Sequence, residues 1–90
     1  MGQIDVKEIR EIVRKYIIDS FIKENDAQLN DDFSFIEEGV IDSVGVMELV
    51  AFLEMSFHFR VEDEELVPAN LDSINRIVTY VDSKLNTVSS

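Results

Sequence analysis

The sequence predicts an all-α fold, a four-helix bundle of three main helices and one short helix with a long loop between the first two. Apolar residues repeat at helical spacing in three segments, and no convincing stretch alternates with the period of a strand. The longest segment between them is rich in Asn and Asp, which favour turns. Ninety residues, 46% of them hydrophobic, predict a single domain over 1–90 with an ordered part of about 5–85.

The first helix is expected over about residues 5–24, where one apolar stripe runs along the chain: Ile9, Ile12, Val13, Tyr16, Ile17 and Phe21. Asp5 followed by Glu8 predicts a capping pair at its start. The following stretch, "NDAQLNDDFSFIEEGVID", is long for a loop. We expect it to pack against the core because it contains Phe33, Phe35, Ile36, Val40 and Ile41.

The second helix is expected to begin at Asp42-Ser43, with Asp42 as N-cap, and to end near Phe57. It is apolar nearly all round, so it is either central in the bundle or has one face that binds something. His58 follows it and tolerates the left-handed conformation that often ends a helix, which favours a structural role for this residue.

The rest of the chain predicts a short turn and a last helix. Pro68 cannot lie inside a helix, so only a short turn at about 63–67 is expected. Asp72 is expected to cap the last helix, whose apolar stripe is regular: Ile74, Ile77, Val78, Val81 and Leu85. The three main helices are expected to pack antiparallel.

Charge narrows the possible partners. The chain has 8 Lys and Arg against 19 Asp and Glu, a net charge of −11, and no Lys or Arg lies between Glu24 and Phe59. Such a polyanion repels nucleic acid and anionic membrane surfaces, and it suits proteins with basic surfaces. No targeting segment or apolar run long enough to cross a membrane is present, so we expect a cytoplasmic protein.

Composition also argues against an enzyme and against a metal site. The absence of cysteine and the presence of one histidine exclude thiolate and multi-His metal sites, as well as a Cys nucleophile. The three glycines, Gly2, Gly39 and Gly45, form no phosphate-binding loop. We therefore expect no independent catalysis.

The dipeptide Asp-Ser occurs four times, and the serines are Ser20, Ser43, Ser73 and Ser83. Ser43 differs from the others in its surroundings. It follows the only glycine of the long connection, begins the unusually apolar helix and lies in the acidic region. Ser73 has a complete structural explanation as the start of a helix.

Around Ser43, residues 31–54 read "DDFSFIEEGVIDSVGVMELVAFLE", which resembles the acyl, peptidyl and D-alanyl carrier protein family. Chain length, acidity and helix order extend the resemblance over nearly the whole chain. It implies that Ser43 is the attachment point of 4′-phosphopantetheine from coenzyme A, and that Asp42 helps the transferase to engage the site. It further implies a carrier that holds acyl or aminoacyl groups as thioesters for fatty acid, polyketide, nonribosomal peptide or related specialised biosynthesis.

The resemblance also implies which residues contact partners. Glu48 and Glu54 match acids that contact basic patches of partner enzymes, whereas Val44, Met47 and Ala51 match an apolar contact surface. Packing in the core remains the alternative for these three apolar residues. The implied partners are a phosphopantetheinyl transferase and an acyl- or aminoacyl-activating ligase, ketosynthase or other acyltransferase with a basic docking patch; the carrier itself is expected to be a monomer.

Two departures refine the resemblance. Gly45 and Met55 stand where fatty-acid-type carriers commonly have acids, which weakens the electrostatic match to fatty acid synthase partners. The string "DSVGV" is more similar to freestanding carriers of specialised pathways and to D-alanyl or aminoacyl carriers. The identity of the carried group stays open.

Two alternatives remain. The first is an acidic helical adaptor that is never modified. The second is an EF-hand-like calcium loop over Asp26–Glu37, because six residues fall at ligand positions: Asp26, Gln28, Asn30, Asp32, Ser34 and Glu37. Asp31 opposes the calcium hypothesis, since it stands where the sharp turn of such a loop needs glycine.

Overall fold

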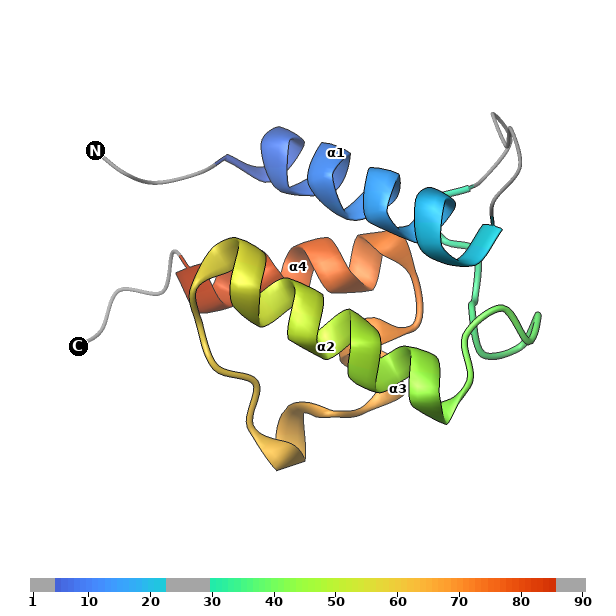
Figure 1. The fold of residues 1–90 in the computed structure, drawn as a ribbon. Helices are drawn as coiled ribbons and strands as arrows, with labels where there is room; N and C mark the ends of the chain where they lie inside the picture. Colours follow the sequence, from blue (N-terminus) through green and yellow to red (C-terminus); the bar gives the residue numbers. More distant parts are fainter. Residues whose placement is uncertain (1–4, 23–29, 86–90) are drawn as a thin grey trace.

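The computed structural model describes residues 5–22 and 30–85, and its secondary structure within these ranges is helical (Figure 1). Four α-helices are present: α1 (Val6–Ile17), α2 (Ser43–Phe57), α3 (Pro68–Leu71) and α4 (Ile74–Leu85). A π-helical turn, η1 (Ile18–Ile22), continues α1, and a 3₁₀ turn, η2 (Asp63–Glu65), precedes α3. The predicted all-α class, with three main helices and a short one, is confirmed.

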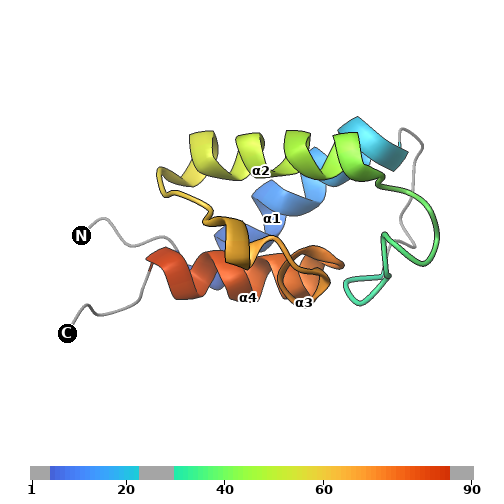
Figure 2. The same cartoon turned by 90° about the horizontal axis from the view of Figure 1, so that it is seen from below.

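The long helices form two layers. α1 runs opposite to α2 and α4 (Figure 1), and α2 lies on the other side of the molecule from α3 and α4 (Figure 2). α1 packs along α4, and α3 packs against α4. α2 and α4 run in the same direction, which differs from a fully antiparallel bundle because the connection through η2 and α3 returns the chain before α4 begins.

The start of α1 agrees with the prediction, and its end does not. The Asp5 carboxylate accepts a hydrogen bond from the Glu8 N–H at 2.9 Å, and the predicted stripe is buried at Ile9, Val13 and Ile17. The α-helix ends at Ile17 and widens into η1, rather than continuing to about residue 24. Residues 23 and 24 of the prediction lie outside the described residues. The apolar spacing cannot distinguish a π turn from an α turn over so few residues.

The structure differs from the sequence prediction at two residues between α2 and α4. Pro68 begins α3, because proline is well suited to the first position of a helix, where its missing N–H costs nothing. Asp72 does not cap α4. The cap is the buried Ser73, whose Oγ accepts a hydrogen bond from the Arg76 N–H at 3.1 Å. Asp72 instead ends α3, and its N–H donates to the Pro68 carbonyl.

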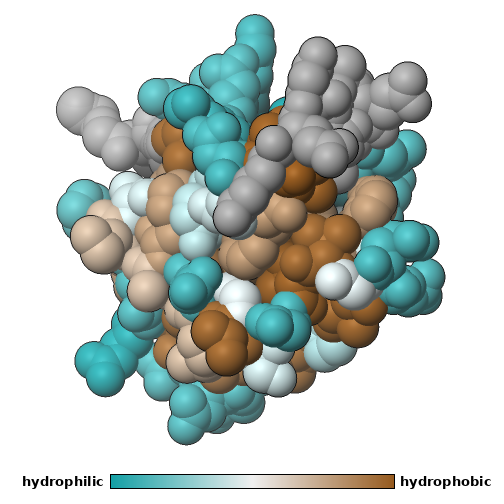
Figure 3. All heavy atoms as spheres, turned by 45° about the vertical axis from the view of Figure 1, so that its right-hand side comes forward, coloured by the Kyte–Doolittle hydropathy of each residue, from teal (hydrophilic) through white to brown (hydrophobic). Residues whose placement is uncertain are grey.

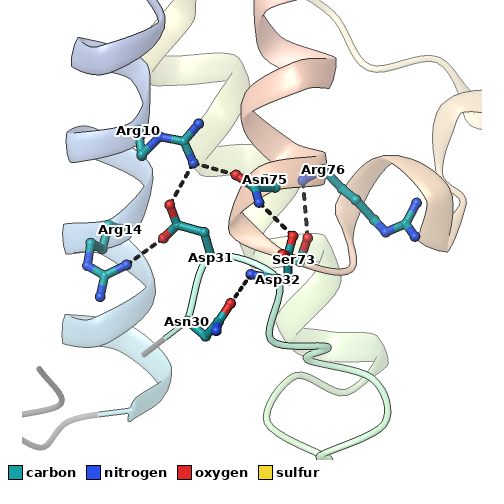
Figure 4. A network of polar contacts seen from close by, with 8 residues as sticks. All are labelled: Arg10, Arg14, Asn30, Asp31, Asp32, Ser73, Asn75 and Arg76. Atoms are coloured by element: carbon teal, nitrogen blue, oxygen red, sulfur yellow. Dashed lines mark hydrogen bonds and ion pairs between the residues drawn. The ribbon is translucent and has the colours of Figure 1, made fainter. Parts of the chain in front are cut away.

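The long connection packs against the core as predicted, except at Ile36, which is 50% exposed, and polar contacts also hold it to the helices. Asp31 accepts hydrogen bonds from Arg10 at 2.8 Å and from Arg14 at 2.7 Å, both from α1 (Figure 4). Asn75 of α4 accepts from Arg10 at 2.6 Å and donates to Asp32 at 2.6 Å. These contacts fix the loop beside α1 and α4, and Phe35 farther along is buried in the core.

A second polar cluster fixes the connection after α2. Glu65 accepts hydrogen bonds from the Glu62 N–H at 3.0 Å, from the Tyr80 hydroxyl at 2.8 Å and from Lys84 Nζ at 3.0 Å. These donors, the Glu62 N–H first, lower the pKa of Glu65 to about 2. Burial and the neighbouring Glu65 raise the pKa of Tyr80, so its hydroxyl stays a neutral donor. η2 is thereby held to α4.

This cluster predicts an acid-dependent loss of stability. Because the pKa of Glu65 falls from 4.5 to about 2 on folding, its contribution is complete above pH 4.5 and disappears as the pH falls toward 2. Glu65→Gln should lower stability at pH 7 by about 1–3 kcal/mol. Thermal unfolding measured from pH 7 to pH 2 should then show the melting temperatures of the wild type and Glu65→Gln approaching each other in acid. Melting temperatures that differ by the same amount at every pH would contradict this role.

Candidate functional site

The start of α2 places Ser43 at the surface. Asp42 Oδ1 accepts a hydrogen bond from the Gly45 N–H at 2.8 Å, and the Asp42 carbonyl accepts from the Val46 N–H at 2.8 Å. The predicted N-cap is therefore confirmed, and Ser43 is the first helical residue with an exposed side chain. A helix N-terminus favours negative charge through its dipole and its free N–H groups. Ser43 is thus an exposed hydroxyl in an environment that suits a phosphate ester.

Gly45 is a packing requirement in the first turn of α2. A Cβ atom at this position would lie 2.9 Å from Phe21 Cε1 and 3.0 Å from Ile41 Cγ2. Both contacts are shorter than real Cβ atoms normally make, so a side chain here would displace its neighbours. An acid at position 45 would therefore point at Phe21 and Ile41 rather than at solvent.

α2 has two apolar faces with different roles. Its core face contains Leu49, Val50, Leu53 and Phe57, all buried. Val44, Met47 and Met55 are 67%, 56% and 75% exposed, and they share the outer side of the helix with Glu48 and Ala51, also exposed. We call these five residues the exposed α2 face. Val44, Met47 and Ala51 therefore do not pack in the core, which was the alternative to a contact surface. Met55 also lies at the surface, although the sequence marks it only as a position where related carriers have an acid.

Hydrophobic areas are broad on the face of the molecule shown in Figure 3, and hydrophilic groups project between them. A helix face with several exposed apolar residues is typical of a surface that contacts other proteins. The exposed α2 face begins one residue after Ser43.

Glu54 differs from Glu48 in its surroundings. It is partly buried, and its Oε2 accepts a hydrogen bond from the Val61 N–H at 2.8 Å. Its carbonyl accepts from the N–H of His58, which adopts the predicted left-handed conformation, with φ 61° and ψ 48°. Glu54 thus helps to fix the chain that leaves α2, whereas Glu48 lies in the exposed α2 face.

An apolar pocket of about 170 Å³ lies next to this site. Its lining comes from the long connection, from α2 and from the segment around α3: Phe35, Ile36, Ile41, Val46, Leu66, Val67, Pro68 and Leu71. Ile41 and Val46 stand on either side of Ser43 in the sequence, so the pocket adjoins the start of α2. The sequence alone does not bring its walls together, because the three segments are far apart in the chain.

The residues of the calcium hypothesis have other partners where they are described. Asp26 and Gln28 lie outside the described residues. Asp32 accepts a hydrogen bond from Asn75, and the Ser34 hydroxyl donates to Asp72 at 2.6 Å. Among the His, Cys, Asp and Glu side chains that the structure describes, no group of three could hold a metal ion. No helix in the described ranges is long and apolar enough to span a membrane.

Comparison with known proteins shows the family of this chain. The family described as "Phosphopantetheine attachment site" matches residues 8–81. The chain is also 36% identical over 74 residues to the acyl carrier protein of Akkermansia muciniphila, an alignment that covers 82% of this chain and 89% of that protein. The chain therefore belongs to the acyl carrier protein family, whose members are carriers rather than enzymes and bear a covalently attached 4′-phosphopantetheine.

Proposed function

We propose that Ser43 is the residue to which phosphopantetheine is attached, within a single carrier domain formed by residues 1–90. One observation carries the assignment: Ser43 is exposed as the first residue of α2, directly after the Asp42 cap. Among the other serines of Asp-Ser pairs, Ser73 is buried and caps α4. The Ser83 hydroxyl donates to the Tyr80 carbonyl at 2.8 Å near the end of α4.

The chain's own groups suit this modification. Ser43 Oγ would lose its proton to a base of the transferase and bond to the phosphorus next to pantetheine, while the P–O–P bond of coenzyme A breaks and adenosine 3′,5′-bisphosphate leaves. The negative phosphodiester would benefit from the positive end of α2. The bound group supplies the thiol that carries cargo as a thioester, which a chain without cysteine lacks. Asp42 holds the first turn of α2 by accepting the Gly45 N–H, so the position of Ser43 is fixed.

The exposed α2 face is the surface that we propose for partner enzymes. The candidates are a phosphopantetheinyl transferase and an acyl- or aminoacyl-activating ligase, ketosynthase or other acyltransferase. Glu48 supplies a negative charge, and Val44, Met47, Ala51 and Met55 supply apolar area. A face with one acid among four apolar residues suits a partner with an apolar patch and a nearby base. This face supports a carrier of a specialised or aminoacyl pathway, which we propose to work in the cytoplasm.

Glu48→Lys is expected to lower kcat/KM of a phosphopantetheinyl transferase for this chain about 10-fold, because it reverses a charge at the contact surface. The melting temperature should stay unchanged, since the side chain is exposed. Glu11→Lys on α1 makes the same change in net charge outside the exposed α2 face. Equal losses in both variants would mean that only the total charge of the chain matters.

The carrier function is tested by incubating the chain with a promiscuous phosphopantetheinyl transferase, coenzyme A and magnesium, followed by intact-mass measurement. We expect the mass to rise by one phosphopantetheine group. The adaptor alternative predicts an unchanged mass under conditions in which a control carrier protein is fully modified. That second result would overturn the assignment of Ser43.

A further inference from the structure

One acidic residue, Asp72, joins two of the segments that line the apolar pocket beside α2. We propose that Asp72 acts as a latch between the two walls of this pocket and thereby limits the size of the carried group. The inference rests on the proposed function, since it concerns cargo attached through Ser43. In the closed state the pocket would accept an uncharged apolar group of about six carbon atoms, and longer groups would require the latch to open.

The latch consists of three hydrogen bonds to Asp72 from consecutive residues of the long connection. Oδ2 accepts from the Ser34 hydroxyl at 2.6 Å, the carbonyl accepts from the Phe35 N–H at 2.8 Å, and Oδ1 accepts from the Ile36 N–H at 2.8 Å. Phe35 and Ile36 line one wall of the pocket, and Leu71, which precedes Asp72, lines the other. Asp72 therefore joins one wall directly to the other.

The walls have few other ways to separate. The wall from Leu66 to Leu71 is held at its beginning by the Glu65 cluster and at its end by Asp72. The opposite wall begins after Asp31 and Asp32, which are tied to α1 and α4. Hydrogen bonds to a carboxylate are stronger than those between neutral groups. Widening the pocket between Ile36 and Leu71 therefore requires the Asp72 bonds to break.

The volume sets the expected size limit. An apolar cavity of about 150 Å³ binds benzene, which has six carbon atoms, and this pocket measures about 170 Å³. Its lining residues are all apolar, so a charged or strongly polar group would lose hydration without gaining hydrogen bonds. Ile36 and Val67 are 50% and 39% exposed, so an apolar cargo would also cover apolar surface that is now in contact with water.

The test uses the full chain loaded from butyryl-, hexanoyl-, octanoyl- and decanoyl-coenzyme A. Loading is verified by intact mass, and the melting temperature is compared with that of the chain carrying unacylated phosphopantetheine. In the wild type, the melting temperature should rise by about 2–5 °C for each methylene that enters the pocket and stop rising near six carbon atoms. Asp72→Ala removes the two bonds to the carboxylate and keeps the Phe35 N–H bond to the carbonyl of residue 72. In this variant the rise should continue beyond six carbon atoms, from a lower starting temperature.

Two further variants distinguish an effect of the Asp72 bonds from a general loss of order in the long connection. Asp32→Ala removes the bond to Asn75 outside the pocket, and it should lower the starting temperature but keep the limit near six carbon atoms. Ser34→Ala removes one bond of the latch and should shift the limit in the same direction as Asp72→Ala, which keeps the test valid if Asp72→Ala does not fold.

The possible failures are distinguishable. A chain that accepts no arm, as judged by mass, overturns the proposed function and the latch with it. A chain that is loaded but shows the same limit in the wild type, Asp72→Ala and Ser34→Ala, or no limit in the wild type, overturns the latch alone.

Discussion

Ser43→Ala is expected to abolish loading by a phosphopantetheinyl transferase completely, while the fold remains intact. The substitution removes the hydroxyl oxygen to which the phosphate would be joined. The side chain is exposed and the Asp42 cap does not depend on it, so the melting temperature should change little. Intact-mass measurement after incubation with the transferase gives the extent of loading, and thermal unfolding of the same sample gives the fold.

Ser83→Ala is the matched control for this substitution. Ser83 also follows an Asp and is exposed, but it lies near the end of α4. This variant should be loaded as fully as the wild type. Loading that survives Ser43→Ala, or that is lost in Ser83→Ala, would place the attachment residue elsewhere.

Leu53→Ala is expected to lower the free energy of unfolding strongly. Leu53 is fully buried in the core, and removal of a buried leucine side chain costs about 2–5 kcal/mol. The total free energy of unfolding of a domain of this size is roughly 5–15 kcal/mol, so the variant should melt at least about 10 °C below the wild type. Chemical unfolding and thermal unfolding both measure this loss.

Met55→Ala, two residues away, should behave in the opposite way. Because Met55 is largely exposed, its truncation should change the free energy of unfolding by at most about 0.5 kcal/mol. It should nevertheless weaken transfer to or from partner enzymes, since it removes apolar area from the exposed α2 face. A large loss of stability in Met55→Ala, or none in Leu53→Ala, would contradict the division of α2 into a core face and an exposed face.

The parts of the fold that follow from short-range chemistry could be predicted from the sequence. The stripe that includes Ile9, Val13 and Ile17 follows the period of an α-helix, and Asp42 is a residue type that caps helices. The left-handed conformation of His58 also agrees with its place directly after a helix. Each of these features depends on a few neighbouring residues, so their order in the chain is sufficient.

The sequence prediction differs from the structure where contacts between distant segments decide which of two neighbouring residues takes a role. Asp72 and Ser73 are both good caps, and the sequence favoured Asp72. In the structure Asp72 is engaged by residues 34–36, and Ser73 is left to cap α4. The π turn after α1 brings Phe21 against Gly45 of α2, another contact between segments that the local pattern does not contain.

The same distinction applies to the candidate site. Ser43 and its cap could be predicted because they lie within one continuous motif. The full lining of the apolar pocket could not, since it comes from three segments between Phe35 and Leu71. The hydrogen bond from the Val61 N–H to Glu54 could not be predicted either. The sequence does not show whether an acid on a helix faces solvent or a neighbouring loop.

Localisation of the phosphopantetheine group on the wild-type chain tests whether Ser43 is the attachment residue. Tryptic cleavage after Lys23 and Arg60 releases residues 24–60, a peptide with three serines: Ser34, Ser43 and Ser56. Tandem mass spectrometry of the loaded chain assigns the modified residue within this peptide. We predict that Ser43 alone carries the group, and a fragment series that places it on Ser34, on Ser56 or outside residues 24–60 would contradict the assignment.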